Sequence, residues 1–571
     1  MSAINRADYT LTDDLRQHLE RTLAMMAESG HVARIWSHDA HLWRSEPEHV
    51  EEISKRLGWL TLPADCLEHV EELEQFAAEV RDAGFERVVL LGMGGSSLTP
   101  WAFEAMFGVA EGFPALSVLD STCPEAVLAA MGGTPLEQCL FIVASKSGTT
   151  VEPNTFFEHF FARVAAVKGD AADDNFIAIT DPGSQLAQLA AQRKLRRVFE
   201  NWPDHGGRYS AMSYFGMVPA ALMGLPVRRI LAEAQAMAEA CGPDVSPDAN
   251  PGALLGALVG CCHSTGRDKL TLLAAPPFTA FGDWVEQLIA ESTGKEGIGI
   301  VPVVGEPMGE AAIYADDRIF VTLQPAGDTS LQAISEELAE AGHPVVDIEM
   351  PGVTAIAQEI FRWEFATAVA GALMGIDPFD QPDVQAAKTL AKSMLDSYTD
   401  GGAIPTPPRI ATEGDLSAYG SICAESVSEA LGTLLSKVNT GDYVALMAYL
   451  PRTDRTDDAL QEIRTAIRDE LSVATTVGYG PRFLHSTGQL HKGGANTGVF
   501  IQFVAEDTAS ADIPGEPYDF GVLKDAQAGG DFEALVARER RALRIHLGED
   551  AEAGLEAVAE MVSEALAERE R

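Results

Sequence analysis

A run of hydroxyl and ammonium side chains follows an apolar stretch near residue 145. The apolar residues 141–144 lead directly into Ser145-Lys146-Ser147-Gly148-Thr149-Thr150. A strand-to-helix turn of this composition offers hydroxyls, one positive charge and backbone N–H groups at the positive end of a helix dipole. These are the donors that a phosphate monoester needs, so the turn is a candidate phosphate site.

A second turn of similar character lies earlier in the chain. The apolar residues 87–91 end in Gly92-Met93-Gly94-Gly95-Ser96-Ser97. Either turn alone is equally typical of an ordinary tight turn. Two such turns in one α/β region favour a site for a sugar phosphate.

Two further patches carry groups suited to charge stabilisation and proton transfer. In Gly206-Gly207-Arg208-Tyr209-Ser210, the glycines allow the guanidinium of Arg208 to lie close to a ligand anion. Gln287 and Glu291 are four residues apart near a predicted helix end, so they share one helical face. Glu291 is a candidate general base, whereas a solvated Glu at a helix end is the structural alternative.

The last two patches contain Lys388 and a pair of histidines. Lys388 falls early in a predicted helix, where a cation is unfavourable without a compensating anion, although an exposed lysine is the simpler interpretation. His485 and His491 lie among Ser, Gln, Lys and glycines in residues 484–494. An imidazole titrates near neutral pH, so this segment is a candidate for acid–base chemistry.

Length and composition limit the class of protein. A chain of 571 residues with 46% hydrophobic residues predicts two to four well-packed domains. The formal charge of −44 disfavours nucleic acid and anionic membranes as partners.

Seven scattered cysteines indicate buried thiols such as Cys261 and Cys262, and no Cys/His spacing fits a metal site, so neither a metal nor a cofactor is expected. The chain opens without a secretory leader or a membrane-length apolar run, and we expect a cytoplasmic protein.

The periodicity predicts an α/β fold. Residues 1–75 are predicted to be helical, with Thr12 as N-cap and an apolar stripe on the first helix. Short buried strands are expected at 87–91, 115–119, 139–144 and 175–180, and at 270–275, 298–304, 318–323 and 344–348. Residues 398–420 are predicted to be a connector, followed by strands at 443–450, 472–479 and 498–504, a helix at 456–470 and a helical tail at 531–571. We therefore expect an N-terminal helical segment (1–75), two doubly wound parallel-sheet domains (76–240 and 241–397) and a C-terminal α/β extension (398–571).

Taken together, these patches resemble the glucose-6-phosphate isomerase family, which is built from two sugar-isomerase domains. The matching pieces are residues 92–96, 145–153, 206–210 and 287–295, the stretch from Asp377 to Lys388, and residues 485–489. The likeness covers most of the chain from about residue 85 to 500. It is closest to the isomerase half of bifunctional transaldolase/glucose-6-phosphate isomerases, although the isomerase motifs leave no room for a transaldolase barrel.

The resemblance implies a set of roles. Gly95 and Ser96, together with Ser145, Lys146, Ser147 and Thr150, would hold the phosphate, and Gln287 would position the sugar. Glu291 would move a proton between C1 and C2 through a cis-enediolate that Arg208 stabilises, and His485 and Lys388 would assist ring opening. A small-molecule sugar phosphate is then the ligand. A homodimer is implied because the family's active site lies at a dimer interface.

The chain departs from the family pattern in two places. Lys388 precedes His485, whereas the His motif of the family comes first, so His491 competes with His485 for the role in ring opening. Asp383 stands where the family often has a small residue and adds a negative charge near Lys388. Two alternatives to a glucose 6-phosphate isomerase remain: a non-catalytic sugar-phosphate regulator, and an isomerase that also accepts mannose 6-phosphate.

Overall fold

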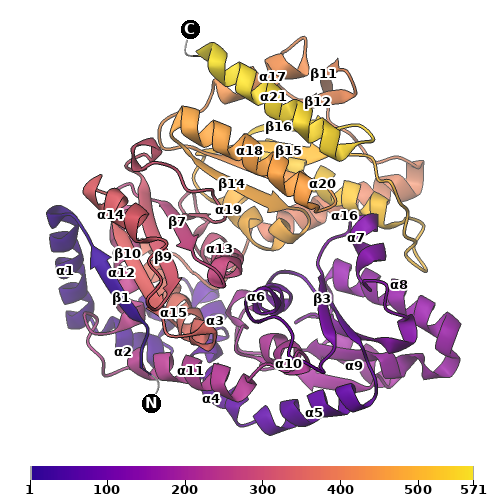
Figure 1. The fold of residues 1–571 in the computed structure, drawn as a ribbon, viewed down its shortest axis with the longest axis horizontal. Helices are drawn as coiled ribbons and strands as arrows, with labels where there is room; N and C mark the ends of the chain where they lie inside the picture. The colour runs from indigo at the N-terminus through magenta and orange to yellow at the C-terminus, as the bar shows by residue number, and fades with distance from the viewer. Residues whose placement is uncertain (1–2, 570–571) are drawn as a thin grey trace. The chain divides into compact units, whose positions relative to one another are not determined.

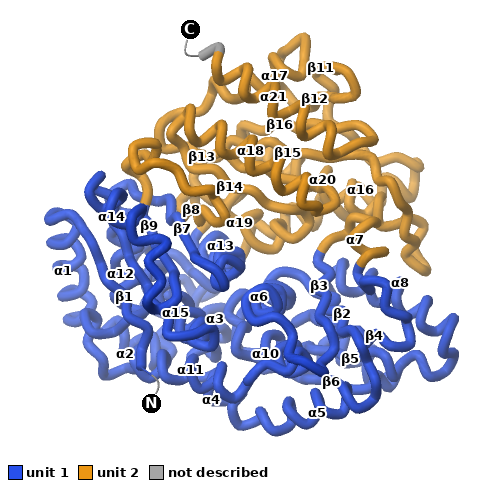
Figure 2. The backbone as a smooth tube through the Cα atoms, viewed as in Figure 1, with its two compact units in different colours: residues 1–120, 130–293, 319–380 blue, residues 121–129, 294–318, 381–571 orange. Residues whose placement is uncertain are grey.

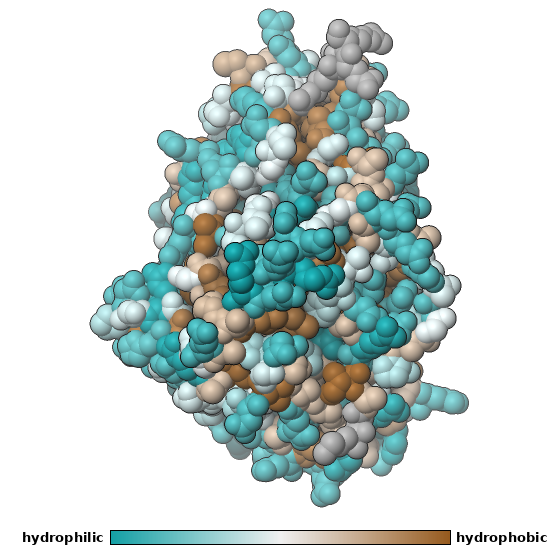
Figure 3. All heavy atoms as spheres, turned by 90° about the vertical axis from the view of Figure 1, so that its left-hand side faces the viewer, coloured by the Kyte–Doolittle hydropathy of each residue, from teal (hydrophilic) through white to brown (hydrophobic). Residues whose placement is uncertain are grey.

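The computed structural model describes residues 3–569, which form two compact units (Figures 1 and 2). Unit 1 contains residues 1–120, 130–293 and 319–380, and unit 2 contains residues 121–129, 294–318 and 381–571. No helix within residues 3–569 is both long and apolar enough to cross a bilayer. The face drawn in Figure 3 is covered mainly by hydrophilic residues, as the strongly acidic composition leads one to expect.

The first sheet of unit 1 is parallel and has the strand order β3-β2-β4-β5-β6. Its strands are β2 (Arg87–Leu91), β3 (Ala115–Leu119), β4 (Cys139–Ala144), β5 (Phe176–Thr180) and β6 (Arg197–Glu200). Every residue of β4 is buried, because helices cover both faces of a sheet of this kind. The order of strands reverses between β2 and β4, and ligands of open α/β sheets bind at the carboxyl ends of strands at such a point.

The second sheet of unit 1 runs β1-β10-β9-β7. Its strands are β1 (Arg6–Thr10), β7 (Lys269–Ala274), β9 (Arg318–Pro325) and β10 (Val345–Met350). Strand β10 is parallel to β9, whereas β1 is antiparallel to β10 and forms an edge. The strand β1 corrects the prediction of a purely helical N-terminal segment. Its sequence Arg-Ala-Asp-Tyr-Thr is too polar to be recognised as a buried strand, and only alternate residues are partly buried.

The helices of unit 1 cover these two sheets (Figure 1). They are α1 (Asp13–Glu28), α2 (His31–Trp36), α3 (Pro47–Ser54), α4 (Leu62–Leu67), α5 (Val70–Asp82), α6 (Leu98–Phe107), α8 (Val151–Lys168), α9 (Gln185–Arg193), α10 (Tyr214–Leu222), α11 (Val227–Ala240), α12 (Pro251–Ser264), α13 (Phe281–Thr293), α14 (Gln332–Glu340) and α15 (Ile356–Met374). Helix α1 has Thr12 as its N-cap and buries Leu15, Leu19, Leu23 and Met26, which confirms the predicted stripe. Helices α12 and α15 pack so closely that a Cβ at Gly256 would lie 2.4 Å from the carbonyl oxygen of Ala366. Cys261 and Cys262 of α12 are buried thiols, as predicted.

Unit 2 is built on a mixed sheet with the strand order β11-β12-β16-β15-β13-β14. Its strands are β11 (Arg409–Glu413), β12 (Leu416–Gly420), β13 (Tyr443–Tyr449), β14 (Ala474–Tyr479), β15 (Gly498–Val504) and β16 (Arg541–His546), and the short β8 (Val301–Val303) also belongs to this unit. Its helices are α7 (Pro124–Ala129), α16 (Val384–Gly401), α17 (Val427–Leu435), α18 (Asp454–Leu471), α19 (Thr487–Gly493), α20 (Phe520–Ala537) and α21 (Ala551–Arg569). Apolar residues from this sheet and from α17, α18 and α21 form its buried core.

Two predictions for unit 2 were wrong. The presumed connector 398–420 contains the last residues of α16 and the hairpin β11–β12, which turns at Gly414-Asp415, where Gly414 has φ +59°. The Gly and Pro content of this segment favoured a connector over a β-hairpin with a two-residue turn. The segment 531–571, predicted to be a helical tail, contains the strand β16 between two helices. The strand was missed because Arg541 and Arg544 interrupt its apolar pattern, and these two side chains bond to Asp442 and Gln502.

Candidate functional site

The two predicted phosphate turns lie at the carboxyl ends of neighbouring parallel strands in unit 1. The turn at 92–97 follows β2, the turn at 145–150 follows β4, and β2 pairs with β4 in parallel. Thr150 is the N-cap of the 18-residue helix α8, so the second turn lies at the positive end of a long helix dipole. The geometry therefore places both turns at the same edge of one sheet, at the point where its strand order reverses.

Hydrogen bonds within the second turn fix its shape. The Ser145 hydroxyl donates to Thr150 Oγ1 at 3.2 Å and accepts from the N–H of Gly148 at 3.1 Å. Gly148 has φ +69°, and a Cβ there would lie 2.4 Å from the backbone nitrogen of Leu186, so only glycine fits. Ser145 is buried, whereas Ser147 is exposed and Thr150 is half-buried.

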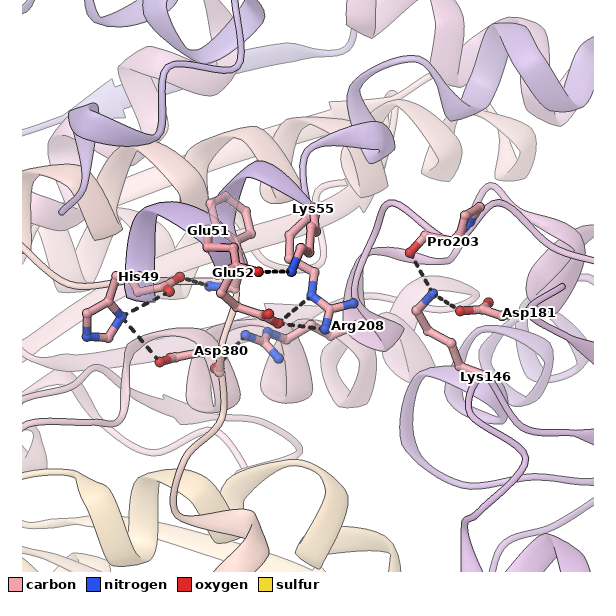
Figure 4. Close-up of polar contacts among 12 residues, drawn as sticks. His49, Glu51, Glu52, Lys55, Lys146, Asp181, Pro203, Arg208 and Asp380 are labelled. Carbon is pink, nitrogen blue, oxygen red and sulfur yellow. Dashed lines mark hydrogen bonds and ion pairs between the residues drawn. The ribbon is translucent and has the colours of Figure 1, made fainter. Parts of the chain in front are cut away.

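The ammonium of Lys146 is held by partners within unit 1. It forms an ion pair with Asp181 and donates to the carbonyl oxygen of Pro203 at 3.0 Å (Figure 4). Burial lowers the pKa of Lys146 below its ordinary value, even though the carboxylate of Asp181 opposes that shift. Lys146 thus links the turn after β4 to the segment that leads to Gly206.

The first turn packs directly against the Gly206–Ser210 segment. A Cβ at Gly95 would lie 2.0 Å from the carbonyl oxygen of Gly207 and 2.9 Å from the nitrogen of Arg208. The Ser210 hydroxyl is 3.4 Å from the carbonyl oxygen of Gly95. The absence of a side chain at Gly95 therefore allows the first phosphate turn to lie against the backbone of Gly207 and Arg208, and Ser96 in that turn is half-buried.

His205 supports this segment and was missed by the sequence analysis. Its Nε2 lies 3.0 Å from Asn201 Nδ2, and its Nδ1 lies 3.0 Å from the carbonyl oxygen of Gly206. Complete burial lowers the pKa of His205 to about 3, so the imidazole is neutral at ordinary pH. A neutral ring can accept from Asn201 and donate to Gly206. The only available signal was its place immediately before the two glycines.

Arg208 is the centre of the candidate site. Its Nε donates to Ser292 Oγ at 2.7 Å, and its Nη2 donates to the carbonyl oxygens of Pro378 and Asp380 at 2.7 and 2.9 Å. Its Nη1 lies 3.4 Å from Glu291 Oε1. Arg208 is 2% exposed, so the direction of its guanidinium is fixed by these contacts rather than by solvent.

Glu291 and Gln287 occupy the last two turns of α13. Gln287 Nε2 donates to Glu291 Oε2 at 3.1 Å, which confirms that the two side chains share one helical face. Glu291 is 8% exposed, so the solvated helix-end alternative is wrong. A carboxylate beside a fixed guanidinium can exchange a proton with a bound substrate while the cation stabilises negative oxygen charge.

The loop that holds Arg208 is itself clamped by the N-terminal segment. His49 on α3 lies with Nδ1 3.3 Å from Asp377 Oδ2 and 3.7 Å from Asp380 Oδ2 (Figure 4). Among the described residues, these three place ligand atoms within 4.8 Å of one another, as a metal site would. Asp377 also accepts from the N–H of Phe379 at 2.9 Å. The contacts of His49 with Asp377 and Asp380 therefore also serve to hold this loop in place.

The two residues predicted for ring opening lie in unit 2. Lys388 is exposed on the second turn of α16, and His485 is half-buried at the end of the short helix Arg482–His485. His491 is fully buried, with ring centroids 5.0 Å from Phe500 and 6.1 Å from Phe483. Burial, followed by the charges of Lys492 and Arg540, holds the pKa of His491 well below its ordinary value. His491 therefore has the environment of a core residue.

Comparisons of this chain with known proteins all point to one family. The sequence model described as "Phosphoglucose isomerase" matches residues 71–299, a range that contains all the candidate residues of unit 1. Glucose-6-phosphate isomerase of Synechococcus sp. (strain JA-3-3Ab) is 30% identical over 386 residues, which are 58% of this chain and 71% of that protein. The enzyme of the same name from Campylobacter jejuni is 25% identical over 390 residues, which are 60% of this chain and 92% of its own.

Two solved structures share the fold. A hypothetical protein from Thermus thermophilus, TT0462, has a TM-score of 0.58 at 24% identity, covering 69% of this chain and 100% of its own. Glucose-6-phosphate isomerase from Chlamydia trachomatis has a TM-score of 0.53 at 21% identity, covering 69% of this chain and 89% of its own. These likenesses agree with the predicted α/β class with two parallel-sheet sugar-isomerase domains.

Proposed function

This chain belongs to the phosphoglucose isomerase family, and from that premise we propose that it interconverts glucose 6-phosphate and fructose 6-phosphate in glycolysis and gluconeogenesis. The observation that supports the assignment most directly is the buried pairing of Glu291 with Arg208. Gly95 packs against Gly207, which brings a candidate phosphate turn beside the same arginine. One acidic group, one fixed cation and a phosphate turn are what an aldose–ketose isomerase requires.

We propose the following division of roles. The turns at 92–97 and 145–150 bind the phosphate through Gly95, Ser96, Ser145, Lys146, Ser147 and Thr150, using backbone N–H groups and the dipole of α8. Glu291 removes the proton from C2 of the open-chain aldose and returns it to C1. Arg208 stabilises the enediolate oxygens, and Gln287 orients both the carboxylate and the sugar.

Ring opening is assigned to His485 and Lys388. Opening a pyranose requires a proton at the ring oxygen and removal of a proton from the O1 hydroxyl, and an imidazole and an amine are suited to these transfers. The core environment of His491 favours His485 for this role. The likeness to the isomerase half of bifunctional transaldolase/isomerase proteins and the homodimer remain predictions from the resemblance, and the cytoplasmic location remains a prediction from the sequence.

A coupled assay tests the proposed function. Purified protein is given fructose 6-phosphate, and production of glucose 6-phosphate and of mannose 6-phosphate is followed by separate coupling enzymes. We expect glucose 6-phosphate to form. Mannose 6-phosphate formed at a similar rate would broaden the assignment, whereas saturable binding of fructose 6-phosphate without either product would indicate a sugar-phosphate regulator.

A further inference from the structure

Gln489 of unit 2 joins three segments that are far apart in the sequence. Its Oε1 accepts from the N–H of Asp383 at 2.9 Å, and its Nε2 donates to Asp383 Oδ2 at 2.7 Å and to the carbonyl oxygen of Gly294 at 2.9 Å. Both amide hydrogens and the amide oxygen are therefore used. Gln489 is completely buried, so each of these bonds is shielded from competing water.

The packing around Gln489 leaves no space for larger neighbours. A Cβ at Gly493 would lie 2.1 Å from Asp383 Oδ2 and 2.7 Å from Gln489 Nε2. A Cβ at Gly294 would lie 2.4 Å from the Cα of Leu490. The close approach of the three segments therefore depends on glycines at the two positions where they touch.

Asp383 explains one departure from the family pattern. Its carboxylate is turned toward Gln489, and its Oδ1 forms an ion pair with Arg538, which follows α20. Arg538 and Arg540 also donate to the carbonyl oxygen of Lys492 in α19. The extra negative charge thus lies within a network that joins the start of α16 to α19 and to the end of α20.

The three joined segments each neighbour a residue of the proposed mechanism along the chain. Asp383 is the N-cap of α16, on which Lys388 lies one turn further on. Gln489 lies on α19, directly after the short helix that ends at His485. Gly294 directly follows α13, whose last turn carries Glu291. Gln489 and Asp383 therefore join the segments that carry the two residues assigned to ring opening, Lys388 and His485.

We propose that Gln489 is a positioning residue for ring opening: it sets the start of α16, and hence Lys388, against the segment that bears His485. This proposal rests on the proposed function. Gln489 contacts neither residue directly in the hydrogen bonds of the structure; it acts through Asp383 and through the backbone of α19. A displacement of about 1 Å in such a group costs up to 10²-fold in rate.

The test uses a double-mutant cycle on the full chain. Gln489→Leu removes all three hydrogen bonds at similar volume, and the milder Gln489→Asn keeps the uncharged amide on a side chain one methylene shorter, which cannot reach Asp383 and Gly294 together. Each is combined with Lys388→Ala, and kcat and KM for glucose 6-phosphate are measured. Gln527→Leu is the matched control, because Gln527 is a buried glutamine of the same unit that accepts from Thr122 at 2.7 Å.

We expect Gln489→Leu to lower kcat about 10- to 100-fold with little change in KM, and Gln527→Leu to leave kcat within about threefold of the wild type. In the Lys388→Ala background the same change should cost much less, because Lys388 no longer needs to be placed. Equal losses in both backgrounds, or a loss matched by Gln527→Leu, would overturn the positioning role. If Gln489→Leu does not fold, Gln489→Asn decides by the same criterion. An inactive wild type would instead refute the proposed function itself.

Discussion

Arg208 and Glu291 meet in unit 1 with Nη1 3.4 Å from Oε1, and both side chains are almost completely buried. The remaining nitrogens of the guanidinium bond to Ser292 and to two backbone carbonyls, so the cation cannot turn away from the carboxylate. A charge held this rigidly needs little reorganisation when negative charge develops beside it, which is the basis of electrostatic catalysis. This pair is the physical core of the proposed isomerase.

Replacement of Arg208 by lysine tests whether the guanidinium shape matters as well as its charge. A lysine keeps one positive charge but cannot serve Ser292 and the carbonyls of Pro378 and Asp380 together. We expect kcat to fall roughly 10²- to 10³-fold. The control is Arg228→Lys, since Arg228 lies more than half exposed near Glu71 and Glu74. Near-normal turnover in Arg208→Lys would show that a point charge is sufficient.

Gly95→Ala tests the close approach of the phosphate turn to Arg208. The new Cβ would lie 2.0 Å from the carbonyl oxygen of Gly207, so one of the two backbone segments must move. We expect a large rise in KM for fructose 6-phosphate and a loss of about 1–3 kcal/mol in the free energy of unfolding. Gly352→Ala is the control, because its backbone is extended and a Cβ there meets nothing within 4 Å. Equal behaviour of the two variants would refute the argument.

The two histidines of the 484–494 segment should respond differently to truncation. His485→Ala is expected to slow turnover of the cyclic sugar while leaving stability nearly unchanged, because His485 is only half-buried. His491→Ala empties a site among Tyr443, Phe483 and Phe500, so it should cost roughly 3 kcal/mol in stability and affect kcat far less. Thermal unfolding and steady-state kinetics measure the two effects separately. The reverse ranking in kcat would transfer the role to His491.

His205 predicts a specific dependence of stability on pH. Burial lowers its pKa from 6.5 to about 3, so the folded state stays neutral where the unfolded state takes up a proton. The contribution of His205 to stability is therefore complete above pH 6.5 and is lost as pH falls toward 3, at roughly 1.4 kcal/mol per pH unit. Gln cannot titrate, so the stability advantage of the wild type over His205→Gln should shrink between about pH 7 and pH 4. Denaturant unfolding across that range measures it, and a constant difference would contradict the assignment.

The sequence predicts the parallel strands well, because β2, β3, β4 and β15 are short apolar runs bounded by turn residues. It fails at β1, β11, β12 and β16, where polar side chains or turn residues mask the strand pattern. β1 is held as an edge strand by β10, and Arg541 of β16 is satisfied by Asp442. Tertiary pairing, which no local pattern reports, determines these strands.

The candidate site shows the same division. Gly95, Arg208 and Glu291 are recognisable as chemical groups from their neighbours in the sequence, but their mutual distances are not. The clamp of His49 on Asp377 and Asp380, the support from His205 and the acceptor Ser292 come from segments distant from Arg208 or from residues of unremarkable local context. Such contacts depend on the packed fold, and only the structure reveals them.

The proton transfer assigned to Glu291 can be measured directly. Glucose 6-phosphate is incubated in deuterium oxide with the wild type and with Glu291→Gln, and deuterium at C1 of the product fructose 6-phosphate is determined by NMR. A single exchanging base predicts deuterium at C1 with the wild type. It also predicts a roughly 10²- to 10⁴-fold slower reaction in Glu291→Gln, with binding of the sugar phosphate retained. Undiminished turnover and labelling in Glu291→Gln would contradict the account.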